Sequence, residues 1–86
     1  MKYIITSTED FDQEIFIFPR TINHDIMAES ISRMKNQSHG NWKRLTRTPI
    51  SAGFISNGVC YGKSESLNIK SRPEDTGILK LYLDID

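Results

Sequence analysis

The segment Tyr61–Ser66 (YGKSES) combines the residue types that bind phosphate groups. A glycine lets backbone N–H groups approach a ligand closely, serine hydroxyls form hydrogen bonds, and a lysine supplies positive charge. Gly62, Lys63 and Ser64 provide all three in consecutive positions. The segment is not a Walker motif, because the preceding glycine spacing is missing. We predict a site for a small anionic ligand beside this segment; the alternative is an ordinary hairpin with solvated Lys and Ser side chains.

The predicted ligand-binding residues include cations and small side chains from elsewhere in the chain. Arg20 and Arg72 lie at junctions between expected elements, where a guanidinium group can reach a ligand or a carboxylate. The aromatic ring of Trp42 or Tyr61 could stack on a base. Either residue is more often part of a hydrophobic core. The full candidate set is Arg20, Arg44, Arg47, Ser51, Gly53, Gly62, Lys63, Ser64, Ser66 and Arg72.

A β-hairpin is predicted around Asn57-Gly58, because this dipeptide lies between two apolar runs and favours a two-residue turn. The turn sets the register of the two strands, so that Phe54 faces Tyr61, Gly53 faces Gly62 and Ser51 faces Ser64. Glycine inside a strand often marks the close approach of a ligand or of another backbone. We interpret the facing glycines as a bare shelf on which the ligand lies.

The sequence contains no recognisable catalytic or metal-binding pattern. Ser64 and Ser66 would need a general base, and no triad pattern connects them to a histidine. The residues that could bind a metal, namely His24, Asp25, His39 and Cys60, are not at ligand spacing. We expect His24 to be solvated at the first position of a helix, and Cys60 to be buried opposite Ile55. We therefore expect no enzyme activity, no metal and no cofactor.

The first half of the chain predicts two strands and one helix. Lys2–Ser7 and Glu14–Phe18 are rich in β-branched and aromatic residues, which favour strands. Helix signals follow: Asn23 as N-cap, and apolar residues at helical spacing over residues 24–35. Asn36 is expected to end this helix in the left-handed conformation. The helix should bury one face against the sheet.

The second half is less regular. Trp42–Thr48 shows no clear period and is interpreted as a loop or a ragged strand. Ser71–Glu74 matches a capping box, which predicts a helix start. The residues after Gly77 fit either a helix or a strand, and we favour a helical turn that passes into a strand. Residues 64–76 are polar, which suggests a mobile loop that closes over a site.

These elements predict one α+β domain over residues 1–86, with an antiparallel sheet and a central hairpin packed on one main helix. The 86 residues carry 11 basic and 11 acidic side chains, which argues against a general polyanion binder. Neither a signal peptide nor a long apolar run is present, so we expect a cytoplasmic protein. Unprotected sheet edges favour a homodimer or a larger closed oligomer.

Several segments resemble a family of small proteins of tailed bacteriophages. The likeness runs from Phe16 to Thr76 and consists of FPR, NHD, SAGF, C-x-G-x-SESL and SRPEDT in this order. No established activity of that family accompanies the resemblance, so it assigns no functional residue. It implies a setting, namely a phage accessory protein made in the bacterial host cytoplasm. Such small proteins often counter host defence, by sequestering a nucleotide signal or by binding a defence protein.

Three functions follow as hypotheses. The first is a non-enzymatic protein that sequesters a small anionic nucleotide in the predicted site. The second is an inhibitor or adaptor that binds a host defence protein through a sheet edge or the acidic start of the chain. The third is weak nucleic-acid binding by a small basic patch of Trp42, Lys43, Arg44 and Arg47, which the neutral net charge disfavours.

Overall fold

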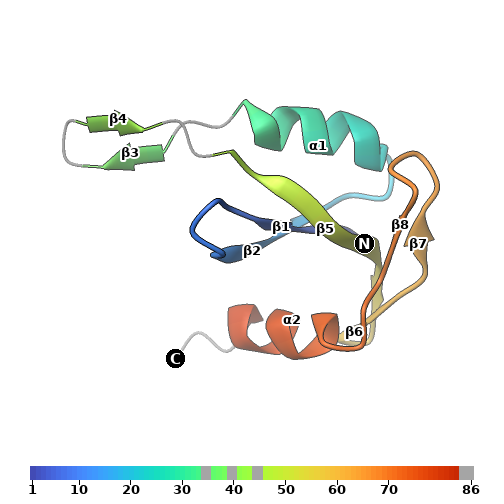
Figure 1. The fold of residues 1–86 in the computed structure, drawn as a ribbon. Helices are drawn as coiled ribbons and strands as arrows, with labels where there is room; N and C mark the ends of the chain where they lie inside the picture. Colours follow the sequence, from blue (N-terminus) through green and yellow to red (C-terminus); the bar gives the residue numbers. More distant parts are fainter. Residues whose placement is uncertain (34–35, 39–40, 44–45, 84–86) are drawn as a thin grey trace.

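The computed structural model describes residues 1–33, 36–38, 41–43 and 46–83. Ten elements follow one another along the chain (Figure 1). They are β1 Lys2–Ser7, β2 Gln13–Phe18, α1 His24–Ser32, β3 Asn36–Ser38, β4 Asn41–Lys43, β5 Thr48–Ser56, β6 Val59–Tyr61, β7 Lys63–Ser64, β8 Ile69–Lys70 and α2 Asp75–Leu83.

An antiparallel sheet of four strands in the order β2-β1-β5-β6 forms the centre of the fold. The two strands predicted at the N-terminus are confirmed, and the second begins one residue earlier than expected. They pair with Lys2 opposite Phe18 and Ser7 opposite Gln13. On its other side β1 pairs with β5, which places Tyr3 opposite Gly53. β1 is therefore an inner strand, and its alternating side chains are buried on both faces of the sheet.

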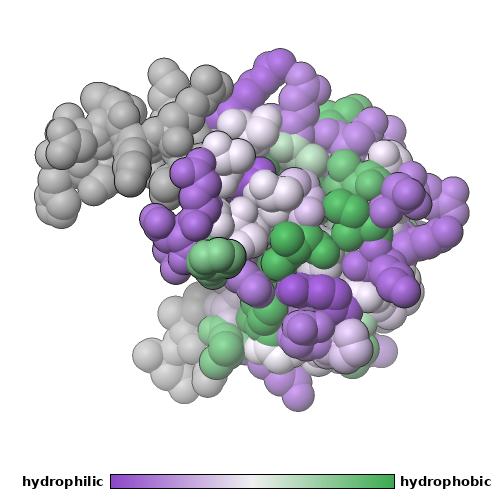
Figure 2. Space-filling model, in the orientation of Figure 1, coloured by the Kyte–Doolittle hydropathy of each residue, from purple (hydrophilic) through white to green (hydrophobic). Residues whose placement is uncertain are grey.

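The two helices cover opposite faces of the sheet (Figure 1). On the α1 face Ile4, Phe18 and Ala52 pack with Ile31 of the helix. On the α2 face Tyr3, Ile5, Ile15 and Cys60 pack with Leu79. Figure 2 shows patches of apolar surface at the level of the sheet, with hydrophilic surface between and around them. The predicted α+β class is confirmed, with a second helix where one main helix was expected.

The predicted hairpin is confirmed in its turn and in its register as far as Phe54 and Tyr61, whereas the predicted pairs Gly53–Gly62 and Ser51–Ser64 are not formed. Asn57 and Gly58 have φ angles of 51° and 75°, as a type I′ turn requires. Phe54 pairs with Tyr61, and Ile55 pairs with Cys60.

The shelf proposed beside this hairpin is absent, because the space over Gly53 is filled. A Cβ atom at Gly53 would lie 2.3 Å from the backbone oxygen of Tyr61 and 3.3 Å from the Tyr3 ring. Gly62 does not pair with Gly53, because β6 ends at Tyr61. Instead Gly62 adopts a φ of 81°, which an L side chain rarely adopts, and redirects the chain. Gly53 thus allows two backbones to approach closely, and Gly62 allows the chain to turn.

Helix α1 begins as predicted and ends earlier than predicted. Asn23 is the N-cap, with φ −73° and ψ 147°, but its side chain makes no capping hydrogen bond. The last helical residue is Ser32, followed by Arg33 in the right-handed region. Asn36 does not cap the helix, because it is the first residue of β3.

Two small hairpins lie outside the main sheet. β3 pairs with β4, so part of the segment Trp42–Thr48 is a strand, which was one of the two interpretations. β7 pairs with β8, with Lys63 opposite Lys70 and Ser64 opposite Ile69. Leu67 and Ile69 pack against the α1-face core. The prediction of a mobile loop at 64–76 is therefore wrong: the segment contains paired strands and buried side chains.

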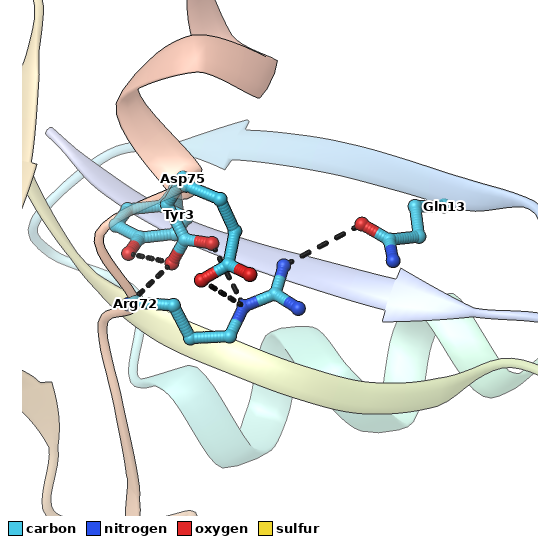
Figure 3. A network of polar contacts seen from close by, with 5 residues as sticks. Tyr3, Gln13, Arg72 and Asp75 are labelled. Carbon is cyan, nitrogen blue, oxygen red and sulfur yellow. Dashed lines mark hydrogen bonds and ion pairs between the residues drawn. The ribbon is translucent and has the colours of Figure 1, made fainter.

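The C-terminal segment is helical as far as Leu83, so the predicted passage into a strand is wrong. The carboxylate of Asp75, at the first helical position, is fully buried (Figure 3). It accepts hydrogen bonds from Tyr3 Oη at 2.6 Å, from the Arg72 backbone N–H at 2.9 Å and from Arg72 Nε at 3.0 Å. Among the described residues, the side chain that binds the backbone before this helix is therefore that of Asp75, which accepts from the Arg72 N–H, in place of the predicted Ser71–Glu74 capping box.

Substitution of Gly53 tests the close approach of β5 and β6. We expect Gly53→Ala to lower the free energy of unfolding by about 2 kcal/mol or more, because the added methyl group meets a backbone oxygen. The control is Gly77→Ala, where a Cβ atom meets nothing within 4 Å. That variant should gain roughly 0.5–1 kcal/mol, because alanine favours the helix. Urea unfolding measures both, and equal stabilities would contradict the packing at Gly53.

Substitution of Asp75 tests the buried carboxylate. We expect Asp75→Asn to lower the free energy of unfolding by about 1–3 kcal/mol, because an amide leaves buried donors without an acceptor. Glu74→Gln is the matched control, since the Glu74 side chain is 62% exposed and its loss should change stability by less than about 0.5 kcal/mol. Thermal and urea unfolding distinguish the two; a stable Asp75→Asn variant would show that the carboxylate is dispensable.

Candidate functional site

The candidate site is a pocket of about 530 Å³ between the start of α1 and the β7–β8 hairpin. We call it the Lys2–Lys63 pocket. It is lined by Lys2, Asn23, His24, Phe54, Lys63, Glu65 and Ser66. Its lining carries two lysines and one glutamate, and the N-terminus of a helix adds partial positive charge. The pocket therefore favours an anion.

The lysines reach the pocket from different elements. Lys2 starts β1 directly opposite Phe54 of β5, and its Nζ donates a hydrogen bond to the Ile22 carbonyl at 2.9 Å. Lys63 starts β7 and is exposed. Lys63 makes no hydrogen bond or ion pair with any other residue that the structure describes. Its ammonium group is available to a ligand.

His24 forms the inner wall of the pocket and is buried, so the prediction that it is solvated is wrong. Nε2 lies 3.0 Å from the Gly53 carbonyl oxygen, which identifies Nε2 as the protonated ring nitrogen. The edges of the Phe18 and Phe54 rings meet the imidazole at centroid distances of 5.3 and 5.8 Å. Burial lowers the pKa of His24 from its ordinary value of 6.5, because the charged form loses its hydration. The imidazole is neutral at pH 7.

Serines of the β7–β8 connection shape the rim of the pocket. Ser66 Oγ accepts a hydrogen bond from the backbone N–H of Asp25 at 3.2 Å, and so supplies the cap that Asn23 does not. Ser64 Oγ is buried and accepts from the N–H of Leu67 at 3.2 Å. Because a hydroxyl from the hairpin caps α1, the hairpin and the helix are held at a defined separation.

The structure brings only part of the predicted residue set to this pocket. Lys63 and Ser66 line it, Ser64 supports it, and Gly62 makes the turn that leads into it. Gly53 lies behind it, with its carbonyl on His24.

Four predicted residues lie elsewhere. Arg47 is buried and pairs with Glu14 through Nε and Oε1 at 3.2 Å. Arg72 forms an ion pair with Asp75. Its partner is thus a carboxylate, which was one of the two expected partners, and not a ligand. Ser51 is buried, and its hydroxyl has no hydrogen-bond partner among the described residues. Arg20 is exposed beyond the end of β2.

Arg44 lies outside the described residues, so its predicted role in ligand binding stays a prediction. The same holds for a base-stacking role of Trp42, since only the backbone of β4 is described. Tyr61 packs on Phe54 at a centroid distance of 5.9 Å, as the cross-strand pair required. In the pocket the aromatic ring is that of Phe54.

Sequence reasoning missed Lys2, Asn23, His24, Phe54 and Glu65 as pocket residues. The pairing of β1 with β5 brings Lys2 next to Phe54, and no short-range pattern reveals that pairing. Glu65 directly follows the predicted YGKS residues. Its proximity to Lys63 in the sequence was therefore the one signal that could have added Glu65 to the predicted site.

Within the part of the chain that the structure describes, no three His, Cys, Asp or Glu side chains come together to hold a metal ion. In the same residues, no helix combines the length and the apolar character needed to span a membrane. Cys60 is buried, and burial raises the pKa of its thiol.

Stability should depend on pH through His24. Its pKa is lower in the folded state, so the unfolded state takes up the proton first as the pH falls. The free energy of unfolding should therefore be flat above about pH 6.5 and decrease below it. His24→Gln should remove this part of the pH dependence of the free energy of unfolding. Urea unfolding from about pH 5 to pH 8 measures it, and an NMR titration of the ring proton beside Nδ1 locates the pKa; a folded-state pKa above 6.5 would contradict the burial of the ring.

Comparisons of the chain with protein-family models, with curated proteins and with solved structures found no match. Two lysines, one of them unpaired among the described residues, stand beside an aromatic ring and the start of a helix.

Proposed function

We propose that the protein binds a small anionic ligand of the nucleotide type in the Lys2–Lys63 pocket and sequesters it without chemical change. The observation that carries the proposal is the placement of Lys63 and Lys2 on one pocket with the ring of Phe54. Ammonium groups attract phosphate oxygens, and an aromatic ring offers a surface for a planar base.

The size of the pocket suits such a ligand. Its volume of about 530 Å³ falls inside the range of roughly 300–1,000 Å³ usual for small-molecule sites. Asn23 and Ser66 supply hydrogen-bonding groups at the rim. A nucleotide offers phosphate, sugar hydroxyls and a base, which match the cationic, polar and aromatic parts of the lining.

The pocket's polar groups favour binding over catalysis. His24 Nε2 is engaged by the Gly53 carbonyl, and burial holds the pKa of this histidine down. Ser66 Oγ has no histidine among its hydrogen-bond partners and accepts from the Asp25 N–H. A nucleophile beside an oriented base, which covalent catalysis needs, is not assembled by these residues.

The resemblance to small tailed-phage proteins adds a setting to this proposal. A phage accessory protein that removes a nucleotide signal from the host cytoplasm would counter a defence that depends on that signal. Tight binding at stoichiometric amounts is sufficient for such a role, so no catalytic group is required.

Binding of mono-, di- and cyclic nucleotides tests the proposal. Native mass spectrometry of the wild-type protein should show a discrete mass addition at integral stoichiometry for at least one compound of the panel. Titration calorimetry should then show that Lys63→Ala weakens the affinity for that compound about tenfold, because one charge-assisted hydrogen bond is lost.

Lys80→Ala is the matched control. Lys80 is exposed on α2 and does not line the pocket, so its loss should leave the affinity unchanged. The melting temperatures of both variants should equal that of the wild type, since neither lysine pairs with another described residue. Absence of binding across the whole panel, or equal weakening by both substitutions, would contradict the proposal.

A further inference from the structure

Among the residues that the structure describes, β2 is an edge strand whose outward backbone N–H and C=O groups have no backbone partner. The N–H of Thr8 bonds the carbonyl of Asp12 at 2.9 Å, which sets the alternation of hydrogen-bonded pairs along β1 and β2. The N–H and C=O groups of Gln13, Ile15 and Ile17 consequently point away from β1. In the sheet order of the described residues, no strand lies on that side.

The opposite edge of the sheet is closed. β6 has only three residues, and the N–H of Cys60, which points outwards, donates to Thr76 Oγ1 at 3.1 Å. A side chain of α2 thus occupies the bonding position that another strand would need. Natural sheets protect edges in such ways, and β2 is the edge left open.

An apolar groove runs beside the open edge. It has a volume of about 480 Å³ and is lined by Gln13, Glu14, Ile15, Ile78, Leu81 and Tyr82. Leu81 is 79% exposed and Tyr82 51% exposed. Phe11, in the loop that leads into β2, is 87% exposed. Large exposed apolar side chains therefore lie beside β2 and in the loop that leads into it.

The charges at the two ends of β2 are opposite. Asp10 and Asp12 precede the strand, and Arg20 follows it, with no Lys or Arg between Lys2 and Arg20. Two β2 strands paired antiparallel would place the acidic end of each beside the basic end of the other. A parallel pair would place like charges together, which is destabilising.

We propose that β2 pairs antiparallel with β2 of a second copy of this chain, around a two-fold axis at Ile15. This register matches Gln13 with Ile17 of the second copy and Ile15 with its counterpart, so every outward-facing group of β2 finds a partner. If the two-fold axis lies one residue further along β2, some of the outward-facing N–H and C=O groups have no partner. The dimer has a continuous sheet of eight strands, four from each copy.

The same axis also covers the apolar groove. It stands perpendicular to the sheet, so the α2 helices of the two copies lie on one face of the joined sheet. The exposed Leu81 and Tyr82 of each copy then face the corresponding surface of the other. In this register the acidic loop before β2, with Asp10 and Asp12, lies at the same end of the paired strands as Arg20 of the second copy.

A charge exchange tests the pairing. Sedimentation velocity over a dilution series gives the dimer dissociation constant of the wild type. Asp10→Lys and Arg20→Glu should each raise this constant about tenfold, because each places like charges together at both ends of the paired strands. The double variant Asp10→Lys/Arg20→Glu should restore the wild-type value. Both residues are exposed, so these changes leave the folded monomer intact.

A proline at Gln13 provides a second test. The N–H of Gln13 points outwards, and proline is tolerated at the first residue of an edge strand. Gln13→Pro should therefore remove intermolecular hydrogen bonds, keep the β1–β2 ladder and weaken the dimer at least tenfold. In the wild-type dimer the amide protons of Ile15 and Ile17 should exchange slowly, and in the proline variant quickly.

The proposal is overturned if the wild type is monomeric at every concentration, and also if it forms a dimer that neither the charge variants nor Gln13→Pro weaken. The first result would leave the β2 edge to a different protein, and the second would place the interface on another face. Either is independent of nucleotide binding, because the Lys2–Lys63 pocket shares no lining residue with the β2 groove.

Discussion

The close approach of β6 to Gly53 is the constraint on which the candidate site depends. With no side chain at Gly53, the Tyr61 carbonyl can occupy the position of a Cβ atom. The chain then turns at Gly62 and enters β7, which carries Lys63. On the other side of Gly53, its carbonyl accepts a hydrogen bond from His24 Nε2 and holds the start of α1. One glycine thus positions both walls of the pocket.

The two faces of the sheet are stabilised in different ways. On the α1 face, Ser66 caps the helix from the β7–β8 hairpin, so the cap is also a contact between the pocket's walls. On the α2 face, the buried carboxylate of Asp75 joins the helix to Tyr3 in the sheet. Burial and the neighbouring carboxylate raise the pKa of Tyr3, so its hydroxyl remains a donor. Removal of a buried partner is costly because the other group is left unsatisfied.

Features with a local cause could be predicted from the sequence. The Asn57-Gly58 turn, the strand Lys2–Ser7 and the Asn23 helix start each depend on neighbouring residues, and the structure confirms all three. His24 was expected to be solvated, because its position at a helix start says nothing of the phenylalanine rings that enclose it.

Features with a long-range cause could not be predicted. Arg47 and Glu14 are far apart in the sequence, and their ion pair depends on how the strands are ordered. Lys2 reaches the pocket only because β1 lies between β2 and β5. The phosphate-binding residue types of YGKSES did identify Lys63 and Ser66, because consecutive residues of one hairpin remain close after folding. The lining of the Lys2–Lys63 pocket was therefore predicted in its hairpin half and missed in its sheet and helix half.

Mapping of nucleotide binding by NMR tests the central claim most directly. Backbone amide shifts of the wild-type protein would be followed while each nucleotide of the panel is added. The account predicts saturable shifts that cluster at His24, Phe54, Lys63 and Ser66, with the α2 amides unchanged. Shifts centred elsewhere, or none for any nucleotide, would contradict the assignment of this pocket as an anion site.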